Sequence, residues 1–190
     1  WSPHSKNLRK IVETLLNIDT ACFHFINTTL SNPVFDFIMP LFHHTKSFIL
    51  FLLFPWILAI VFDKPNRWKL ACIIPIVIIL TDQTGLFIKK TILRPRPFVE
   101  LDVIQFVKES GLRKSFPSNH AANSAALATV FSMVYPHLRF ILWGLAITVM
   151  FSRVYIGVHY PLDIIAGGTL GIFYGLLSVK GWNYFTNNSF

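Results

Sequence analysis

Apolar segments alternate with short polar segments along most of the chain. Five of them are long enough, or nearly so, to cross a hydrocarbon core of ~30 Å as helices that rise ~1.5 Å per residue. These segments cover residues 47–62, 70–88, 121–135, 138–151 and 161–179. In the last one Gly167, Gly171 and Gly175 recur every four residues, which predicts close packing against the backbone of another helix.

The N-terminal residues 8–30 predict a helix with two unlike faces. Apolar residues such as Ile11 and Leu15 recur at helical spacing, while polar residues such as Glu13 and Asn17 fall on the opposite side. Crossing lipid with so many polar groups is costly. The pattern therefore favours a helix at the membrane interface, or one packed on the bundle, over a spanning helix.

Polar segments that contain proline separate the apolar ones. Asn32 and Pro33 end the first helix, and residues 89–114 are expected to form a loop with at most short helices. A second short apolar piece, 34–42, completes an N-terminal region of residues 1–46. The apolar piece is followed by the adjacent His43 and His44, which could suggest a metal site. Because no third ligand follows at a recognisable spacing, we interpret them as part of an interfacial loop.

The amino-acid composition indicates the class of protein. The 190 residues are 53% hydrophobic, include 19 Phe and have a mean hydropathy of +0.54. We expect a single all-α integral membrane domain over residues 1–190, a helical bundle with about five transmembrane helices plus the N-terminal amphipathic helix. The number of spans becomes six if that helix crosses.

The net charge of +8 bears on partners. In a soluble protein it would suggest nucleic acid, but here Lys and Arg cluster in the short gaps between apolar segments. Anionic membrane lipids or phosphate-bearing substrates are therefore the expected partners, with no nucleic acid. No obligate protein partner is inferred.

Three residues inside apolar segments require an interpretation of their own. Cys22 and Cys72 match no metal or redox spacing, so both are interpreted as packing residues. Asp82 precedes Lys89 by two helical turns on the same face. Either it helps to orient a polar site, or neighbouring helices satisfy its carboxyl group.

Alternation of the last four apolar segments brings distant polar residues to one end of the bundle. That end holds Lys89, Arg94, Arg96, Ser118, His120, Arg153, His159 and Asp163. The opposite end holds Lys64, Arg67, Lys69, Arg139 and Lys180, which are the positive residues expected on the cytoplasmic side. The first cluster is then expected to face outward, toward the periplasm, from a multi-pass protein of the inner membrane.

The outward cluster has the chemistry to bind a phosphoryl group. Fixed Lys and Arg donors stabilise the charge on its oxygens, and the helix N-termini after Ser118 and Pro161 add backbone N–H groups. A histidine held by a carboxylate can attack phosphorus, and a second can protonate the leaving oxygen. The alternative from a different class is an anion path in a transporter or channel, which would release no phosphate.

Three motifs carry this chemistry in order. They are Lys89 followed by Arg96-Pro97 (Lys-x6-Arg-Pro), then Pro117-Ser118-Asn119-His120, then Ser152-Arg153 followed by His159 and Asp163 (Ser-Arg-x5-His-x3-Asp). The motifs span residues 89–163 and resemble those of the type 2 phosphatidic acid phosphatase (PAP2) superfamily of membrane lipid phosphatases.

The resemblance implies a role for each residue. His159 would be the nucleophile that forms a phosphohistidine, Asp163 would orient it, and His120 would be the general acid for the leaving group. The phosphate would be bound by Lys89, Arg96, Ser118 and Arg153. The scheme requires no metal ion and no cofactor.

Asn119 departs from the family motif, which has Gly at this position. Asn is among the few residues that tolerate a left-handed backbone, so the turn is expected to survive. Its side-chain amide is also expected to reach the bound phosphate.

The resemblance extends to substrates. The family includes phosphatases for undecaprenyl diphosphate, phosphatidylglycerophosphate, lipid A 1-phosphate and phosphatidate. The compact size and the N-terminal amphipathic region resemble bacterial members that act at the outer face of the inner membrane. Lipid A 1-phosphate and undecaprenyl diphosphate are thus the expected substrates, and phosphatidylglycerophosphate is a third candidate. Soluble vanadium haloperoxidases share the motifs, but the apolar segments argue against that class.

Overall fold

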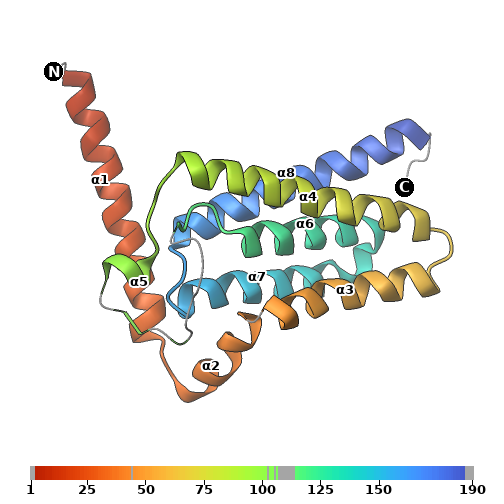
Figure 1. Ribbon diagram of the computed structural model, residues 1–190, viewed down its shortest axis with the longest axis horizontal. Coiled ribbons are helices and arrows are strands. Elements are labelled where there is room, and N and C mark those ends of the chain that lie inside the picture. The colour runs from red at the N-terminus through yellow and green to blue at the C-terminus, as the bar shows by residue number, and fades with distance from the viewer. Residues whose placement is uncertain (1–2, 44, 102, 105, 107–113, 187–190) are drawn as a thin grey trace.

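The computed structural model describes residues 3–43, 45–101, 103–104, 106 and 114–186. Within this part of the chain the regular elements are all helical, as predicted (Figure 1). In order they are α1 (Pro3–His24), η1 (Phe25–Thr29), α2 (Pro33–Ile38), η2 (Met39–Phe42), α3 (Thr45–Phe62), α4 (Arg67–Thr91), α5 (Pro97–Glu100), α6 (Asn119–Val134), η3 (Pro136–Leu138), α7 (Arg139–Tyr155) and α8 (Pro161–Thr186).

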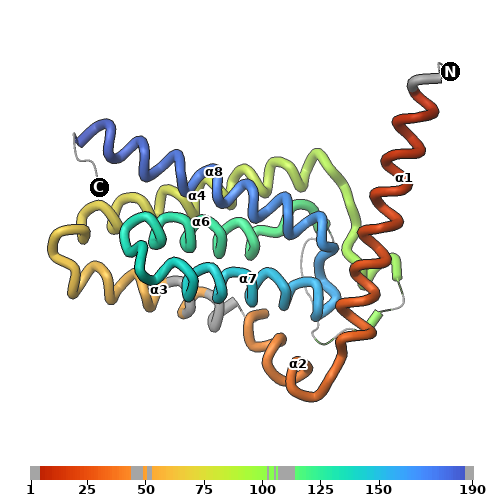
Figure 2. The backbone as a smooth tube through the Cα atoms, turned by 180° about the vertical axis from the view of Figure 1, so that it is seen from behind, coloured from red at the N-terminus to blue at the C-terminus, as the bar shows by residue number. Residues whose placement is uncertain are grey.

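Five long helices run side by side as a bundle. These are α3, α4, α6, α7 and α8, and α6 lies among α4, α7 and α8 with most of its residues buried. Helix α1 lies across one end of the bundle and extends away from it, as Figures 1 and 2 show from opposite sides. At that same end α4 and α7 finish while α6 and α8 begin (Figure 1).

The contact between α6 and α8 depends on the glycines of α8. A Cβ on Gly167 would lie 2.3 Å from the carbonyl oxygen of Ser118, and one on Gly171 would lie 2.1 Å from that of Ala122. One on Gly175 would lie 2.9 Å from Cβ of Thr129. The two backbones therefore touch along this face, which confirms the packing role predicted from the four-residue spacing.

A hydrophobic core lies toward the other end of the bundle. It joins α4, α6 and α8 through Leu70, Ile73, Ile74, Val77, Ala126, Leu127, Val130, Phe131 and Val179. The outward faces of the long helices are also apolar and exposed, for example at Ile79, Phe140 and Phe173. A large exposed apolar surface of this kind is expected of a protein surrounded by lipid.

Among the residues that the structure describes, three helical segments are long and apolar enough to cross a membrane. They cover Arg67–Thr91, Pro136–Tyr155 and Pro161–Thr186 and contain the predicted segments 70–88, 138–151 and 161–179. The other two predicted segments also form helices, but α6 has 16 residues and the described apolar part of α3 covers only Leu53–Phe62. The helical fold and three candidate spans are thus established.

The predicted N-terminal helix is present, and its contact with the bundle is partly polar. Ile11 and Leu15 are exposed on α1. The side that packs on the rest of the protein consists of Asp19, Phe23 and Asn27, which are spaced four residues apart and buried. Asn27, in the η1 segment that continues α1, donates to the carbonyl oxygen of Tyr155 (2.7 Å) and so ties η1 to the end of α7.

Several sequence-based interpretations were wrong in detail. Lys89 belongs to the last turn of α4 instead of the following loop, at a helix C-terminus where the dipole favours a cation. Helix α8 continues beyond the predicted segment 161–179 and runs to Thr186. Cys22 and Cys72 are exposed, since each lies one position away from the buried face of its helix. The short α5 agrees with the expected loop, whereas the expected turn at His44 lies outside the described residues.

The α6–α8 contact can be tested by adding one methyl group. We expect Gly171→Ala to lower the free energy of unfolding by at least about 1–3 kcal/mol, because the new Cβ meets a backbone carbonyl that has no rotamer to adjust. The measurement is the thermal unfolding midpoint in detergent. Gly181→Ala is the control, since Gly181 lies in the same helix and a Cβ added there would have nothing within 4 Å. Equal midpoints for the two variants would contradict the close contact.

Candidate active site

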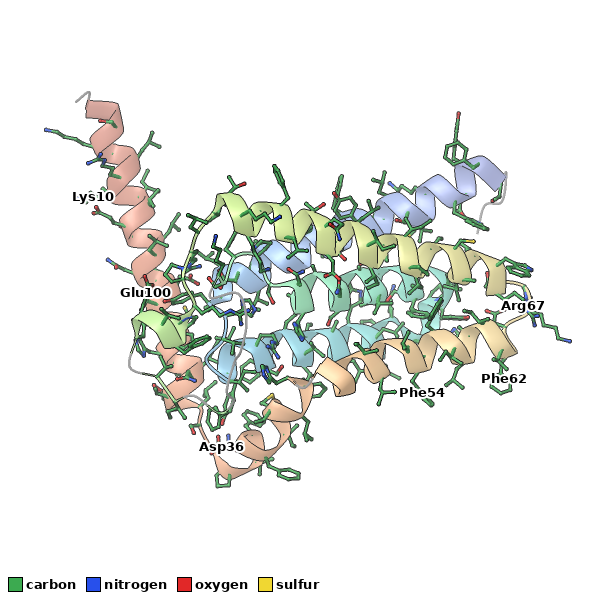
Figure 3. All side chains as sticks on the ribbon, viewed as in Figure 1. Lys10, Asp36, Phe54, Phe62, Arg67 and Glu100 are labelled. Carbon is green, nitrogen blue, oxygen red and sulfur yellow. The ribbon has the colours of Figure 1, made fainter. Side chains whose placement is uncertain are left out.

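The predicted polar cluster lies at the end of the bundle where α1 crosses. Figure 3 shows Glu100 at this end and Arg67 at the opposite end. Hydrogen bonds and electrostatic contacts join all three motifs here, so the structure brings together residues that the sequence separates by up to 74 positions, from Lys89 to Asp163.

His159 and Asp163 lie at the junction of α7 and α8. Helix α7 ends at Tyr155, and Gly157 turns the chain with a φ of +84°, a conformation that glycine adopts without strain. His159 Nδ1 then lies 3.5 Å from Asp163 Oδ2, with the two side chains 3% and 0% exposed. This separation exceeds an ordinary hydrogen bond, as is common for catalytic pairs in sites without substrate.

Two further groups fix the Asp163 carboxylate. Its Oδ2 accepts from the backbone N–H of Tyr160 (2.9 Å), and its Oδ1 accepts from Arg94 (2.9 Å). The Arg94 guanidinium also lies 3.8 Å from the centre of the Tyr160 ring. The carboxylate is therefore held in one orientation beside His159.

Arg94 is in turn paired with Asp19 of α1, at 2.6 Å. The other oxygen of Asp19 accepts from the backbone N–H of Leu162 (2.8 Å), one of the first-turn donors of α8 that have no partner within the helix. The sequence predicts that Arg94 lies at this end of the bundle but indicates no role for it, and no sequence pattern singles out Asp19. No spacing links these two residues, because the contact joins α1 to the segment between α4 and α5, 75 positions further along the chain.

Ser118 and His120 begin α6. The Ser118 hydroxyl accepts from the backbone N–H of Ala121 (3.4 Å), which makes Ser118 the N-cap of the helix. Its own backbone N–H donates to the carbonyl oxygen of Asp163 (3.0 Å) and so fixes the second motif against the third. His120 lies in the first turn, and its electrostatic neighbours include Arg153 and His159.

Three cations approach the histidines from different elements. Lys89 (6% exposed) comes from the end of α4, Arg96 is the N-cap of α5, and Arg153 (1% exposed) comes from the last turn of α7. Arg153 donates to the carbonyl oxygen of Phe42 (3.4 Å) and contacts Nδ1 of His43 (3.1 Å). His43 therefore belongs to the site, although the sequence suggested only an interfacial loop.

The side chain of Asn119 forms hydrogen bonds to two residues of α4. Its side-chain oxygen accepts from Lys89 (2.6 Å), and its side-chain nitrogen donates to Asp82 (2.9 Å). Asp82 also accepts from Asn123 (3.1 Å). Both interpretations of Asp82 are thus supported, since α6 satisfies its carboxylate and Asn119 connects it to Lys89.

Burial and charge set the protonation of His159. Burial lowers the pKa of this imidazole well below its usual range, and the charges of Arg96, Arg153 and Lys89 lower the pKa further. The neutral form, which is the nucleophilic one, therefore predominates at neutral pH. A cationic site around a neutral imidazole is suited to bind an anion and to attack it.

The arrangement fits a phosphoryl group better than a metal ion. Within the described ranges there is no group of three or more His, Cys, Asp or Glu residues that could hold a metal. The carboxylates of Asp19 and Asp163 are both engaged by Arg94. Cations at several positions around one space match the dispersed charge of phosphate oxygens.

Comparison with known proteins agrees with this chemistry. The sequence model of the PAP2 superfamily matches residues 70–187. Lipid A 4'-phosphatase of Bacteroides thetaiotaomicron is 33% identical over 181 residues, which cover 88% of this chain and 78% of that protein. Undecaprenyl-diphosphatase of Sulfolobus acidocaldarius is 32% identical over 124 residues, 65% of this chain and 59% of that one.

A solved structure is similar as well. The crystal structure of Aquifex aeolicus LpxE superposes with a TM-score of 0.74 at 30% sequence identity, covering 86% of this chain and 95% of that chain. The family match, the relatives and the shared fold agree. The chain belongs to the PAP2 superfamily and is a phosphatase of the PAP2 type, a hydrolase from a family that acts on lipid phosphates without a metal ion.

Proposed function

We propose that this protein removes phosphate from a membrane lipid, either a lipid A phosphomonoester or undecaprenyl diphosphate, through a phosphohistidine intermediate. The observation that carries the proposal is the placement of neutral His159 among Lys89, Arg96 and Arg153, with Asp163 behind it. The similarity to a lipid A 4'-phosphatase and to an undecaprenyl-diphosphatase supports the substrate class. Phosphatidylglycerophosphate is a third candidate.

In the first step the neutral imidazole of His159 attacks phosphorus through Nε2. The negative charge of the bound phosphoryl group favours the uptake of a proton by His120. The bond between phosphorus and the bridging oxygen breaks, and protonated His120 gives this proton to that oxygen as the dephosphorylated lipid, or the lipid monophosphate, leaves. The three cations stabilise the charge on the other phosphoryl oxygens. The resulting imidazolium loses its Nδ1 proton toward Asp163 or is stabilised by it.

In the second step water attacks the phosphohistidine. His120, now neutral, takes a proton from the water, the bond between phosphorus and Nε2 breaks, and inorganic phosphate is released. His159 returns to its neutral form, which the surrounding cations favour. One histidine therefore acts as nucleophile and leaving group, and the other acts first as acid and then as base.

An apolar cavity supports access for the lipid tails. A space of about 230 Å³ lies among α3, α6 and α7, lined by residues that include Phe54, Ser124, Ala128, Leu145 and Ala146. Ser124 is one helical turn below His120, the residue proposed to protonate the leaving lipid. The cavity is thus on the side of the site where an acyl or prenyl chain would extend into the bilayer.

Orientation in the membrane completes the proposal. We infer that α3, α4, α6, α7 and α8 all cross the inner membrane and that the site faces the periplasm. Exposed Lys64, Arg139 and Lys180 at the far end of the bundle support this orientation by the positive-inside rule. Helix α1 would then lie in the outer interface with its exposed apolar residues in lipid.

Phosphate release from a panel of lipids tests the activity. We expect the protein purified in detergent to hydrolyse lipid A 1-phosphate, lipid A 4'-phosphate or undecaprenyl diphosphate faster than phosphatidylglycerophosphate or the tail-less p-nitrophenyl phosphate. Excess chelator should leave the rate unchanged. His159→Ala should reduce it by at least about 10³-fold while preserving the unfolding midpoint, since it removes the nucleophile. No release from any lipid, together with anion flux in liposomes, would favour a channel instead.

The pH dependence tests the electrostatics of His159. Because its pKa is lowered, the nucleophilic form persists into acid, and the acidic limb of kcat/KM should fall below the ordinary histidine value of about 6.5. Arg96→Gln removes a positive charge and should move this limb to higher pH, in addition to slowing the reaction. The distant Lys180→Gln is the control. Ionisation of the substrate is the same for every variant, so an unmoved limb in Arg96→Gln would contradict the assignment.

Thiol labelling tests the orientation. In a background that lacks the exposed Cys22 and Cys72, single cysteines are introduced at Val99, beside the site, and at Lys64, in the far turn. An impermeant thiol reagent should label intact spheroplasts at position 99 only. Labelling at position 64 only would place the site in the cytoplasm.

A further inference from the structure

One face of α4 is shaped around the side chain of Asn119. Asp82, Gly85 and Lys89 lie on this face at spacings of three and four residues. A Cβ on Gly85 would be 2.7 Å from Oδ1 of Asn119 and 3.2 Å from its Cγ. The amide of Asn119 therefore occupies space that exists only because residue 85 is glycine.

Both ends of this amide are engaged. Oδ1 accepts from Lys89 Nζ at 2.6 Å, and Nδ2 donates to Asp82 Oδ1 at 2.9 Å. The orientation of the amide is thus fixed, since only the oxygen can accept from an ammonium and only the nitrogen can donate to a carboxylate.

Asp82 is held by a second residue of α6. It accepts from Asn123 Nδ2 (3.1 Å), and Asn123 Oδ1 accepts from the buried hydroxyl of Thr81 (2.5 Å). Thr81 Oγ1 also contacts the carbonyl oxygen of Val77 (2.9 Å) in its own helix. Hydrogen bonds in such a chain polarise one another, and a fully satisfied buried network has one arrangement. Asn119 is the member of this network that reaches the site.

The network gives Lys89 an acceptor without pairing it directly with a carboxylate. Its ammonium has three donors, of which one is directed to the Pro117 carbonyl oxygen and one to Asn119. One donor is therefore left for a phosphate oxygen. The amide transmits the negative charge of Asp82 as an aligned dipole, whereas a direct ion pair would compete with phosphate for the lysine.

We propose that Asn119 is a positioning residue for Lys89, and that Asn119, Gly85 and Asp82 form one unit that replaces the glycine of the family motif. The unit acts on phosphate through Lys89, so both faces of the Asn119 amide are used within the protein. This inference rests on the proposed function for the role of Lys89. The coupling between Gly85 and Asn119 follows from the geometry alone.

A double-mutant cycle between positions 85 and 119 tests the proposal. Gly85→Ala pushes the Asn119 amide away from Lys89, and Asn119→Gly removes the amide. Each change should weaken the binding of inorganic phosphate by about tenfold, as expected for loss of one hydrogen bond to a charged group. In the double variant the methyl group has nothing to displace. Its affinity should therefore equal that of Asn119→Gly alone.

The measurements are calorimetric binding of inorganic phosphate and inhibition by vanadate, both on the full chain in detergent. Gly144→Ala is the matched control, because Gly144 is also in a long helix and has nothing within 4 Å of its Cβ position. It should bind phosphate as the unmodified protein does. Asp82→Asn provides a third route, since it removes the charge that aligns the amide, and it should lower phosphate affinity in the same direction.

Additive effects of Gly85→Ala and Asn119→Gly would overturn the coupling. Lower unfolding midpoints with unchanged phosphate affinity in all three variants would reduce the unit to a purely structural role and overturn the positioning of Lys89. Failure of the proposed function looks different. In that case the unmodified protein would hydrolyse none of the lipid phosphates, while the cycle of phosphate affinities would still show whether residues 85 and 119 act together.

Discussion

The backbone contact between α6 and α8 fixes the second and third motifs against each other. Gly167 and Gly171 let α8 approach until the carbonyl groups of Ser118 and Ala122 lie against it. Where α6 and α8 begin, the Ser118 N–H donates to the Asp163 carbonyl oxygen. This hydrogen bond fixes the start of one helix against the start of the other. Two helix N-termini therefore face the same space, and their dipoles add to the positive potential there.

Carboxylates close to the site offset part of this positive charge. Arg94 lies between Asp19 and Asp163 and pairs with both, so the carboxylate beside His159 has a cationic partner within the protein. Asp82 has the corresponding place behind Lys89, with the amide of Asn119 between them. Carboxylates and cations thus alternate around His159, at the cost of burying several ionised groups.

The sequence predicted what depends on local pattern. Periodicity predicted the helices, and alternation of the apolar segments predicted the end of the bundle where Lys89, His120 and His159 lie. The resemblance of their motifs to those of the family gave these residues their expected roles. The sequence did not predict Asp19, because an acidic residue on an amphipathic helix looks like any solvated residue until another helix covers it. His43 and Gly85 were missed for the same reason, since their partners, Arg153 and Asn119, are distant in sequence.

The fit of Asn119 against Gly85 also constrains the history of the site. A protein with glycine at position 119 can carry either glycine or alanine at 85, because no amide lies in the way. Once asparagine is present, a methyl group at 85 displaces its amide from Lys89. Glycine must therefore already be present at 85 when asparagine appears at 119, on any path that keeps the lysine in place. With asparagine at 119, a larger residue at 85 is no longer tolerated alone, so the residue in one helix limits which residues the other helix can accept.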